Sequence, residues 1–163
     1  MEKIFSPFKL SDNYQVGCYF YDINGTQKFR LASEIFYKKV DGCIIVYDIT
    51  NQKSFDEIEN YFIPTIKKNC IKNIPTLLLG NKTDLKDLRI ISVNQGMQLA
   101  LKYNFIFRET SSIENININD IFKTIIEKTY YDCKDREQND NNSITLNHNH
   151  NLNFKRYKSD CCN

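Results

Sequence analysis

The residues best suited to chemistry stand directly after short apolar runs. Asn81, Lys82 and Asp84 belong to the sequence NKTD, which follows the run TLLL and Gly80. The carboxylate of Asp84 can accept two hydrogen bonds, and the N1–H and exocyclic amine of guanine donate two. Asn81 can reach the base or join neighbouring loops, and the aliphatic stem of Lys82 can cover the face of the ring. An N-K-x-D sequence on its own is also compatible with a solvated turn.

Two further groups of polar residues end other predicted strands. Ser111 and Ser112 belong to the sequence ETSS, where backbone N–H groups can reach the same base. Asp22 and Gly25 form D-x-x-G after an earlier strand, where an aspartate can hold a water of Mg²⁺ and a glycine N–H can reach a terminal phosphate. Because ligands of open α/β sheets bind at the carboxyl ends of strands, the set predicts a guanine-nucleotide site.

Five predicted strands must position these residues. Two aromatic and β-branched segments flank the turn-prone Ser11-Asp12-Asn13 and predict an antiparallel hairpin. Continuous apolar runs, which are typical of strands buried on both faces of a parallel sheet, predict two more, and a short segment before ETSS predicts the fifth. The five segments are Ile4 to Leu10, Tyr14 to Tyr21, Cys43 to Tyr47, Thr76 to Leu79 and Phe105 to Phe107.

Helices are predicted between and after these strands. Ser54 to Asn69 has apolar residues at helical spacing, and Pro64 predicts a kink or a broken end. Ser92 and Gln95 fit a capping box, after which Val93, Met97, Leu99, Ala100 and Tyr103 form an apolar face. A short irregular helix is expected within Gln27 to Lys39, and a last helix from about Asn119 to Tyr131. Strands alternating with helices indicate an α/β fold with a mostly parallel sheet and an antiparallel edge hairpin.

Composition limits the class of protein. The formal charge of +2 over 163 residues gives no indication of nucleic acid as a partner. No apolar run approaches 18 residues and the N-terminus is too polar for a secretory signal, so we expect the chain in the cytosol. Cys18, Cys43, Cys70 and Cys133 are scattered singly, which indicates reduced thiols. Residues 132–163 are rich in Asn, Asp, Lys and Glu and predict a disordered tail.

The chain resembles the Ras superfamily of small GTPases, and within it the Rab family, over residues 1–131. DINGTQKFR resembles the family's DTAGQERFR, IFYKKVDGCIIVYDITNQKSF resembles YYRGAxGxxLVYDITxxxSF, GNKTDL matches the base motif, and ETSS resembles ETSA. The resemblance implies a P-loop NTPase-like (Ras-like) domain over 1–131. It also implies binding of GTP or GDP with Mg²⁺, GTP hydrolysis, and a switch that recruits effectors in vesicle-mediated transport.

The C-terminus supports an anchor of the kind that such proteins carry. Rab proteins bear geranylgeranyl groups on paired terminal cysteines, and Cys161 and Cys162 occupy that place before Asn163. Two lipid chains meet the usual requirement for stable anchoring, and Lys155, Arg156 and Lys158 add attraction to an anionic leaflet. The resemblance implies partners in the prenylation and escort machinery. It also implies a location on the cytoplasmic face of an intracellular or plasma membrane, with a cytosolic pool.

Some parts of the family pattern are not found. No stretch fits the phosphate loop G-x-x-x-x-G-K-[ST], and by resemblance the first strand, first helix and first switch are expected to be missing as well. The missing strand would lie between residues 14–21 and 43–47 and leave a gap in the sheet. Thr26 occupies the place of the glutamine that orients the attacking water, so slow hydrolysis is expected. The alternative is a pseudo-GTPase, a lipid-anchored interaction module without nucleotide turnover.

Overall fold

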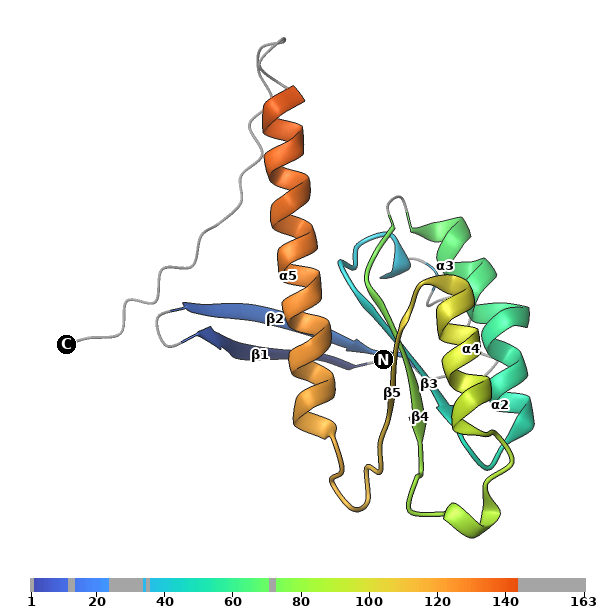
Figure 1. Cartoon of the computed structure of the whole chain (residues 1–163). Helices are drawn as coiled ribbons and strands as arrows, with labels where there is room; N and C mark the ends of the chain where they lie inside the picture. Colours follow the sequence, from blue (N-terminus) through green and yellow to red (C-terminus); the bar gives the residue numbers. More distant parts are fainter. Residues whose placement is uncertain (1, 12–13, 24–33, 35, 71–72, 144–163) are drawn as a thin grey trace, which may run out of the picture.

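The computed structural model describes residues 2–11, 14–23, 34, 36–70 and 73–143. Their order of elements alternates strands with helices after an initial hairpin. Helices cover one face of a small parallel sheet, and one long helix crosses its other face (Figure 1). The predicted α/β fold, with a mostly parallel sheet and an antiparallel hairpin, is confirmed.

The parallel sheet consists of β3 (Cys43–Asp48), β4 (Thr76–Asn81) and β5 (Ile106–Glu109), in the order β3-β4-β5. Both neighbouring pairs are parallel. All three predicted strands are confirmed, each extended at its carboxyl end into the polar motif that follows. Successive side chains of a strand point to opposite faces, and apolar residues on both faces let this sheet be covered from both sides.

The first crossover between β3 and β4 is helical but irregular. It runs through α2 (Gln52–Glu57), a π-helical segment η2 (Ile58–Phe62) and α3 (Ile63–Asn69). Pro64 lies at the start of α3, directly after the π-helical segment. Because proline has no N–H to donate to the preceding turn, the wider π-helical turn carries the irregularity that the sequence predicts at this point.

The second crossover is the regular helix α4 (Val93–Tyr103), after the short 3₁₀ helix η3 (Lys86–Leu88). The predicted capping box is confirmed, with both the Ser92 side chain and the Gln95 side chain bonded to the backbone of the first turn. The predicted apolar face is right for Leu99 and Ala100, which are buried, and wrong for Val93 and Met97, which are 44% and 46% exposed. Those two positions lie on the outer side of α4, away from the sheet.

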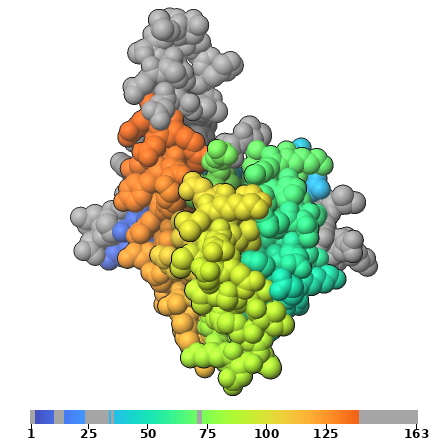
Figure 2. All heavy atoms as spheres, turned by 45° about the vertical axis from the view of Figure 1, so that its right-hand side comes forward, coloured from blue at the N-terminus to red at the C-terminus, as the bar shows by residue number. Residues whose placement is uncertain are grey.

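Two apolar clusters hold the layers together. The first joins the inner faces of α2 to α4 to one face of the sheet through residues such as Ile45, Ile58 and Leu78. The second joins the other face of the sheet to α5 (Ile118–Ser143) through Leu77 and Ile121 among others. In the view of Figure 2, α4 lies between the α2–α3 segment on its right and α5 on its left.

The N-terminal hairpin is formed by β1 (Glu2–Ser11) and β2 (Tyr14–Asp22), which pair antiparallel as predicted. It is a two-stranded sheet of its own, and among the described residues no ladder joins it to β3. One face of the hairpin packs on α5, where the rings of Phe20 and Phe122 meet edge to face at 5.4 Å. Among the described residues, α5 therefore packs against both sheets, which share no ladder.

The last helix is longer than predicted. The expected end near Tyr131 is wrong, because α5 continues to Ser143, through residues 132–143 of the segment predicted to be disordered. Lys128 pairs with Asp132 one turn later at 2.8 Å, and Arg136 Nε donates to the Asp132 carbonyl at 2.9 Å. Local side-chain pairs and the absence of Gly and Pro let the helix extend beyond its apolar contacts. Residues 144–163 lie outside the described part.

The helix expected within Gln27 to Lys39 falls mostly outside the described residues. Of its described part, Tyr37 is buried in the first cluster, which makes it a core residue. Phe36 contacts the ring of Tyr21, with centroids 5.4 Å apart. The described helices are each too short or too polar to cross a bilayer.

Candidate functional site

The carboxyl ends of β4 and β5 bring the NKTD and ETSS sequences into contact. Gly80 of β4 pairs with Glu109, the last residue of β5, so the two strands end next to each other at one edge of the sheet. Beyond that point, Thr110 N–H donates to the Gly80 carbonyl at 2.8 Å, and Thr83 N–H donates to the Thr110 carbonyl at 3.1 Å. These bonds continue the strand pairing into the loops and fix the backbone from which the site residues project.

Asp84 and Ser111 form the first direct contact between the two motifs. The Ser111 hydroxyl donates to Asp84 Oδ1 at 2.6 Å. Ser111 is fully buried, and its oxygen also accepts the Glu114 N–H at 3.1 Å, which fixes the orientation of the hydroxyl. Among the described residues none donates to Asp84 Oδ2, so one carboxylate oxygen is held and the other is free to accept from a ligand.

Asn81 joins the same two loops by a second route. Its Oδ1 accepts hydrogen bonds from Ser112 N–H at 3.3 Å and from Ser112 Oγ at 3.2 Å, in addition to Lys82 N–H at 2.7 Å. Of the two roles predicted for Asn81, this geometry supports the one that ties neighbouring loops. Lys82 has a φ of 70°, a left-handed conformation that non-glycine residues rarely adopt. The hydrogen bonds of Asn81 and the backbone conformation of Lys82 therefore fix the position of both residues.

Asp48 is a further residue of the site, and it was not predicted. It ends β3, next to β4, and its Oδ2 lies 2.5 Å from Lys82 Nζ. Its Oδ1 accepts from Thr50 N–H at 2.8 Å and Thr50 Oγ1 at 2.7 Å. Partial burial acts to raise the pKa of Asp48, but the hydrogen bonds from Lys82 and Thr50 outweigh it and the pKa is lowered. The sequence signal was its place directly after CIIVY, the same signal that identified Asn81.

A bidentate ion pair between Arg89 and Glu109 joins the two loops next to the sheet. Arg89 donates to both carboxylate oxygens of Glu109, at 2.7 and 2.9 Å, and both side chains are mostly covered. The hydrogen bonds that Arg89 donates to Glu109 raise the pKa of Arg89. Paired parallel bonds of this kind are among the stronger interactions of folded proteins. The pair connects the segment after the NKTD loop to the residue that begins ETSS.

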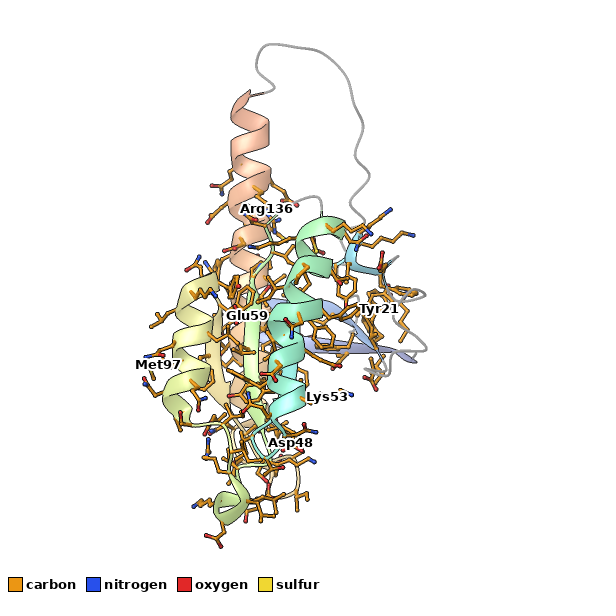
Figure 3. All side chains as sticks on the ribbon, turned by 90° about the vertical axis from the view of Figure 1, so that its right-hand side faces the viewer. Tyr21, Asp48, Lys53, Glu59, Met97 and Arg136 are labelled. Carbon is orange, nitrogen blue, oxygen red and sulfur yellow. The ribbon has the colours of Figure 1, made fainter. Side chains whose placement is uncertain are left out.

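The remaining predicted site residues are not joined to this group in the described structure. Asp22 is an exposed residue at the end of β2, in the sheet that shares no ladder with β3. Figure 3 shows Tyr21, its neighbour, at a different height in the molecule from Asp48 at the strand ends. Gly25, Thr26, Cys161 and Cys162 lie outside the described residues. Within the described ranges, no group of three or more His, Cys, Asp and Glu residues is arranged to hold a metal ion.

The assembled group suits a flat, polar, uncharged ligand better than a phosphate. It offers a carboxylate oxygen at Asp84, polar hydroxyls and backbone groups from the ETSS loop, and the apolar stem of Lys82. The charge of Lys82 is already neutralised by Asp48. These are the features of a site that reads the edge of a heterocyclic base and covers its face.

Comparison with known proteins identifies the family. The sequence profile of the Ras family matches residues 8–131, and the chain belongs to this family. Its relatives include the Ras-related protein Rab-8A of Bos taurus, which is 38% identical over 114 residues, 70% of this chain and 55% of that protein. The Ras-related protein Rab-8B of Homo sapiens is 34% identical over 132 residues, 81% of this chain and 63% of that protein. The chain thus matches 55% to 63% of the length of these relatives.

Proposed function

We propose that the group at the ends of β3, β4 and β5 binds the guanine base of GTP or GDP, in a Rab-type switch of vesicle-mediated membrane transport. The observation that carries the proposal is the double contact between the two motifs, Ser111 with Asp84 and Ser112 with Asn81. Two loops far apart in the sequence form one polar surface. Relatives that are Rab proteins support the cellular role.

Guanine is the base that fits the free acceptor. It presents two donors on one edge, the N1–H and the exocyclic amine, whereas adenine presents an acceptor at N1. A carboxylate held by Ser111 at one oxygen and free at the other favours the donor pair and repels the acceptor. Selectivity should be large, because a buried polar group without a partner costs more than a missing apolar contact.

The phosphate and magnesium half of the site is proposed from the family pattern. Members of the Ras family bind GTP or GDP together with Mg²⁺, and the metal neutralises charge on the phosphates. In this chain Asp22 would hold a water of the metal and Gly25 would donate its N–H to the terminal phosphate. The contacts between the NKTD and ETSS loops support the base half of the proposal, and Asp22 is the one described residue that we propose for this half.

The membrane half of the function is carried by the C-terminal cysteines. We propose geranylgeranyl groups on Cys161 and Cys162, added by prenylation and escort proteins, with effectors as partners of the anchored form. This places the protein on the cytoplasmic face of an intracellular or plasma membrane, with a cytosolic pool. Incubation with a Rab prenyl transferase, its escort protein and geranylgeranyl diphosphate should add two lipid masses. Replacement of both cysteines by serine should abolish the addition, and unchanged mass of the unaltered chain would refute the anchor.

Base binding is tested most directly with a mononucleotide and an isotope-labelled chain. GMP should shift backbone NMR signals of residues 81–84 and 110–113, and AMP should leave them in place. Asp84→Asn presents an amide N–H or a weaker acceptor to the two donors of guanine and should remove the response. Asp135→Asn, at an exposed position of α5 far along the chain, is the matched control. Equal shifts with GMP and AMP would refute a guanine site.

A pseudo-GTPase is the second candidate, and Thr26 is the observation that favours it. A threonine hydroxyl cannot orient an attacking water as a glutamine side chain does. This reading keeps the lipid anchor and the interaction role but drops nucleotide turnover. Single-turnover measurement of phosphate release from GTP separates the two. Release well above the uncatalysed rate excludes the pseudo-GTPase, and release at that rate excludes the enzyme.

A further inference from the structure

We infer that Asp48 is a positioning residue of the base site, which fixes the side chain of Lys82 so that its aliphatic stem is held ready for the ring of the ligand. The inference rests on the proposed function, because it assigns a role within the same site. Asp48 comes from a third strand, β3, which neither NKTD nor ETSS includes.

Asp48 is held by hydrogen bonds at its Oδ1 and at its backbone N–H. Its Oδ1 accepts two hydrogen bonds from Thr50, and its backbone N–H donates to Ser54 Oγ at 3.0 Å. Ser54 Oγ in turn donates to the carbonyl of Asn51, which caps α2, at 2.7 Å. The position of the other carboxylate oxygen, Oδ2, is therefore fixed by the start of α2 as well as by the end of β3, and Oδ2 is the oxygen that pairs with Lys82.

Lys82 is held at both of its ends as a result. Its backbone N–H donates to Asn81 Oδ1 at 2.7 Å, and its Nζ lies 2.5 Å from Asp48 Oδ2. A lysine side chain has about four rotatable bonds and loses much conformational freedom when a ligand orders it. Here the ion pair orders it in advance, so less freedom remains to be lost when a base arrives. The side chain is still 47% exposed, which leaves its stem accessible.

Two measurements on the full chain test the inference. Brief acetylation followed by mass spectrometry compares Lys82 with Lys86, an exposed lysine of the next turn that serves as an internal reference. In the unaltered chain Lys82 should react several-fold more slowly than Lys86, and in Asp48→Asn the two rates should approach each other. In parallel, the Kd for GMP should rise roughly three- to tenfold in Asp48→Asn, the range of a partly exposed ion pair and an unfixed lysine.

Further variants separate positioning from general stability. Asp48→Glu keeps the charge and should recover part of the affinity, whereas Asp87→Asn, an exposed acid in η3, should leave Kd unchanged. Lys82→Met keeps an apolar stem without the charge and should weaken GMP binding as Asp48→Asn does. Combining the two changes should add no further loss, because both remove one interaction. If Asp48→Asn does not fold, Lys82→Met and Asp48→Glu still supply the comparison.

The outcomes for the two proposals differ. Equal acetylation of Lys82 and Lys86 in the unaltered chain, or an unchanged Kd in Asp48→Asn, would overturn the role of Asp48. Absence of any response to GMP in the unaltered chain would refute base binding. In that case the acetylation ratio still decides whether Asp48 fixes Lys82.

Discussion

Replacement of Gly96 by alanine tests how tightly α4 is packed against the sheet that carries the site. Gly96 is a buried residue of α4. A Cβ added there would lie 2.5 Å from Tyr47 Oη and 2.6 and 2.8 Å from two ring atoms of Phe107. Ordinary contacts begin near 3.4 Å, so two aromatic rings, or the whole helix, must move. Tyr47 has little room, because it is 1% exposed and packs on Phe55 with ring centroids 5.0 Å apart.

Two effects of opposite sign decide the magnitude. Alanine favours a helix over glycine by about 1 kcal/mol, whereas overpacking of a closed core costs about 1 to 3 kcal/mol. Because rigid ring atoms surround the new methyl group, the upper part of the second range applies. The net loss should be about 2 kcal/mol, which for a chain of this size lowers Tm by about 4 to 8 °C.

Thermal and urea unfolding followed by circular dichroism measure this loss. Gln98→Ala, on the exposed side of the same helix, should change stability by no more than about 0.5 kcal/mol. In a Tyr47→Phe background the closest contact is gone, so the penalty of Gly96→Ala should shrink by at least about 0.5 kcal/mol. A Gly96→Ala protein as stable as the original, or an undiminished penalty beside Phe, would refute the packing argument.

Three further predictions concern caps and charges. Ser92→Ala removes the side-chain bond to Gln95 N–H, 3.2 Å in the structure, and should cost about 1 kcal/mol in urea unfolding. Arg89→Met leaves the covered Glu109 carboxylate without its partner and should cost about 1 to 3 kcal/mol, with faster hydrogen exchange at residues 110–112. Burial, and then the charge of Glu109, raises the pKa of Tyr47 to about 12. Because the phenol keeps its proton to higher pH in the folded state, its contribution to the free energy of unfolding is complete below pH 10.0 and is lost as pH rises through about 12. In Tyr47→Phe the free energy of unfolding should therefore fall less steeply with pH in that range.

Much of the fold could be predicted because local patterns and core packing agree. CIIVY and TLLL are apolar on both faces, and the structure covers both faces of β4. On β3 the prediction is right for Ile45 and Tyr47, which are buried, and wrong for Val46, which is 51% exposed. The capping box at Ser92 was recognised because both partners lie within one turn of the helix. The placement of Asn81, Asp84 and Ser111 followed from a general property of parallel sheets, whose strand ends gather at one edge.

The errors arose where the deciding contact is not local. Val93 and Met97 have the spacing of a buried face, but the side of a helix that meets the sheet is set by the packing of the whole layer. Residues 132–143 lack apolar periodicity, and their helix follows from propagation of α5 beyond its packed part and from side-chain pairs within it.

The sequence by itself determined the family, the order of strands and helices, and the two motifs that meet at the strand ends. Only the tertiary structure decided that Asp48 holds Lys82, that Asn81 ties one loop to the other, and that the hairpin and the parallel sheet share α5 without sharing a ladder. The physical reason is the same in each case. Periodicity and propensity act over a few residues, whereas these contacts join residues that the chain brings together only when it packs.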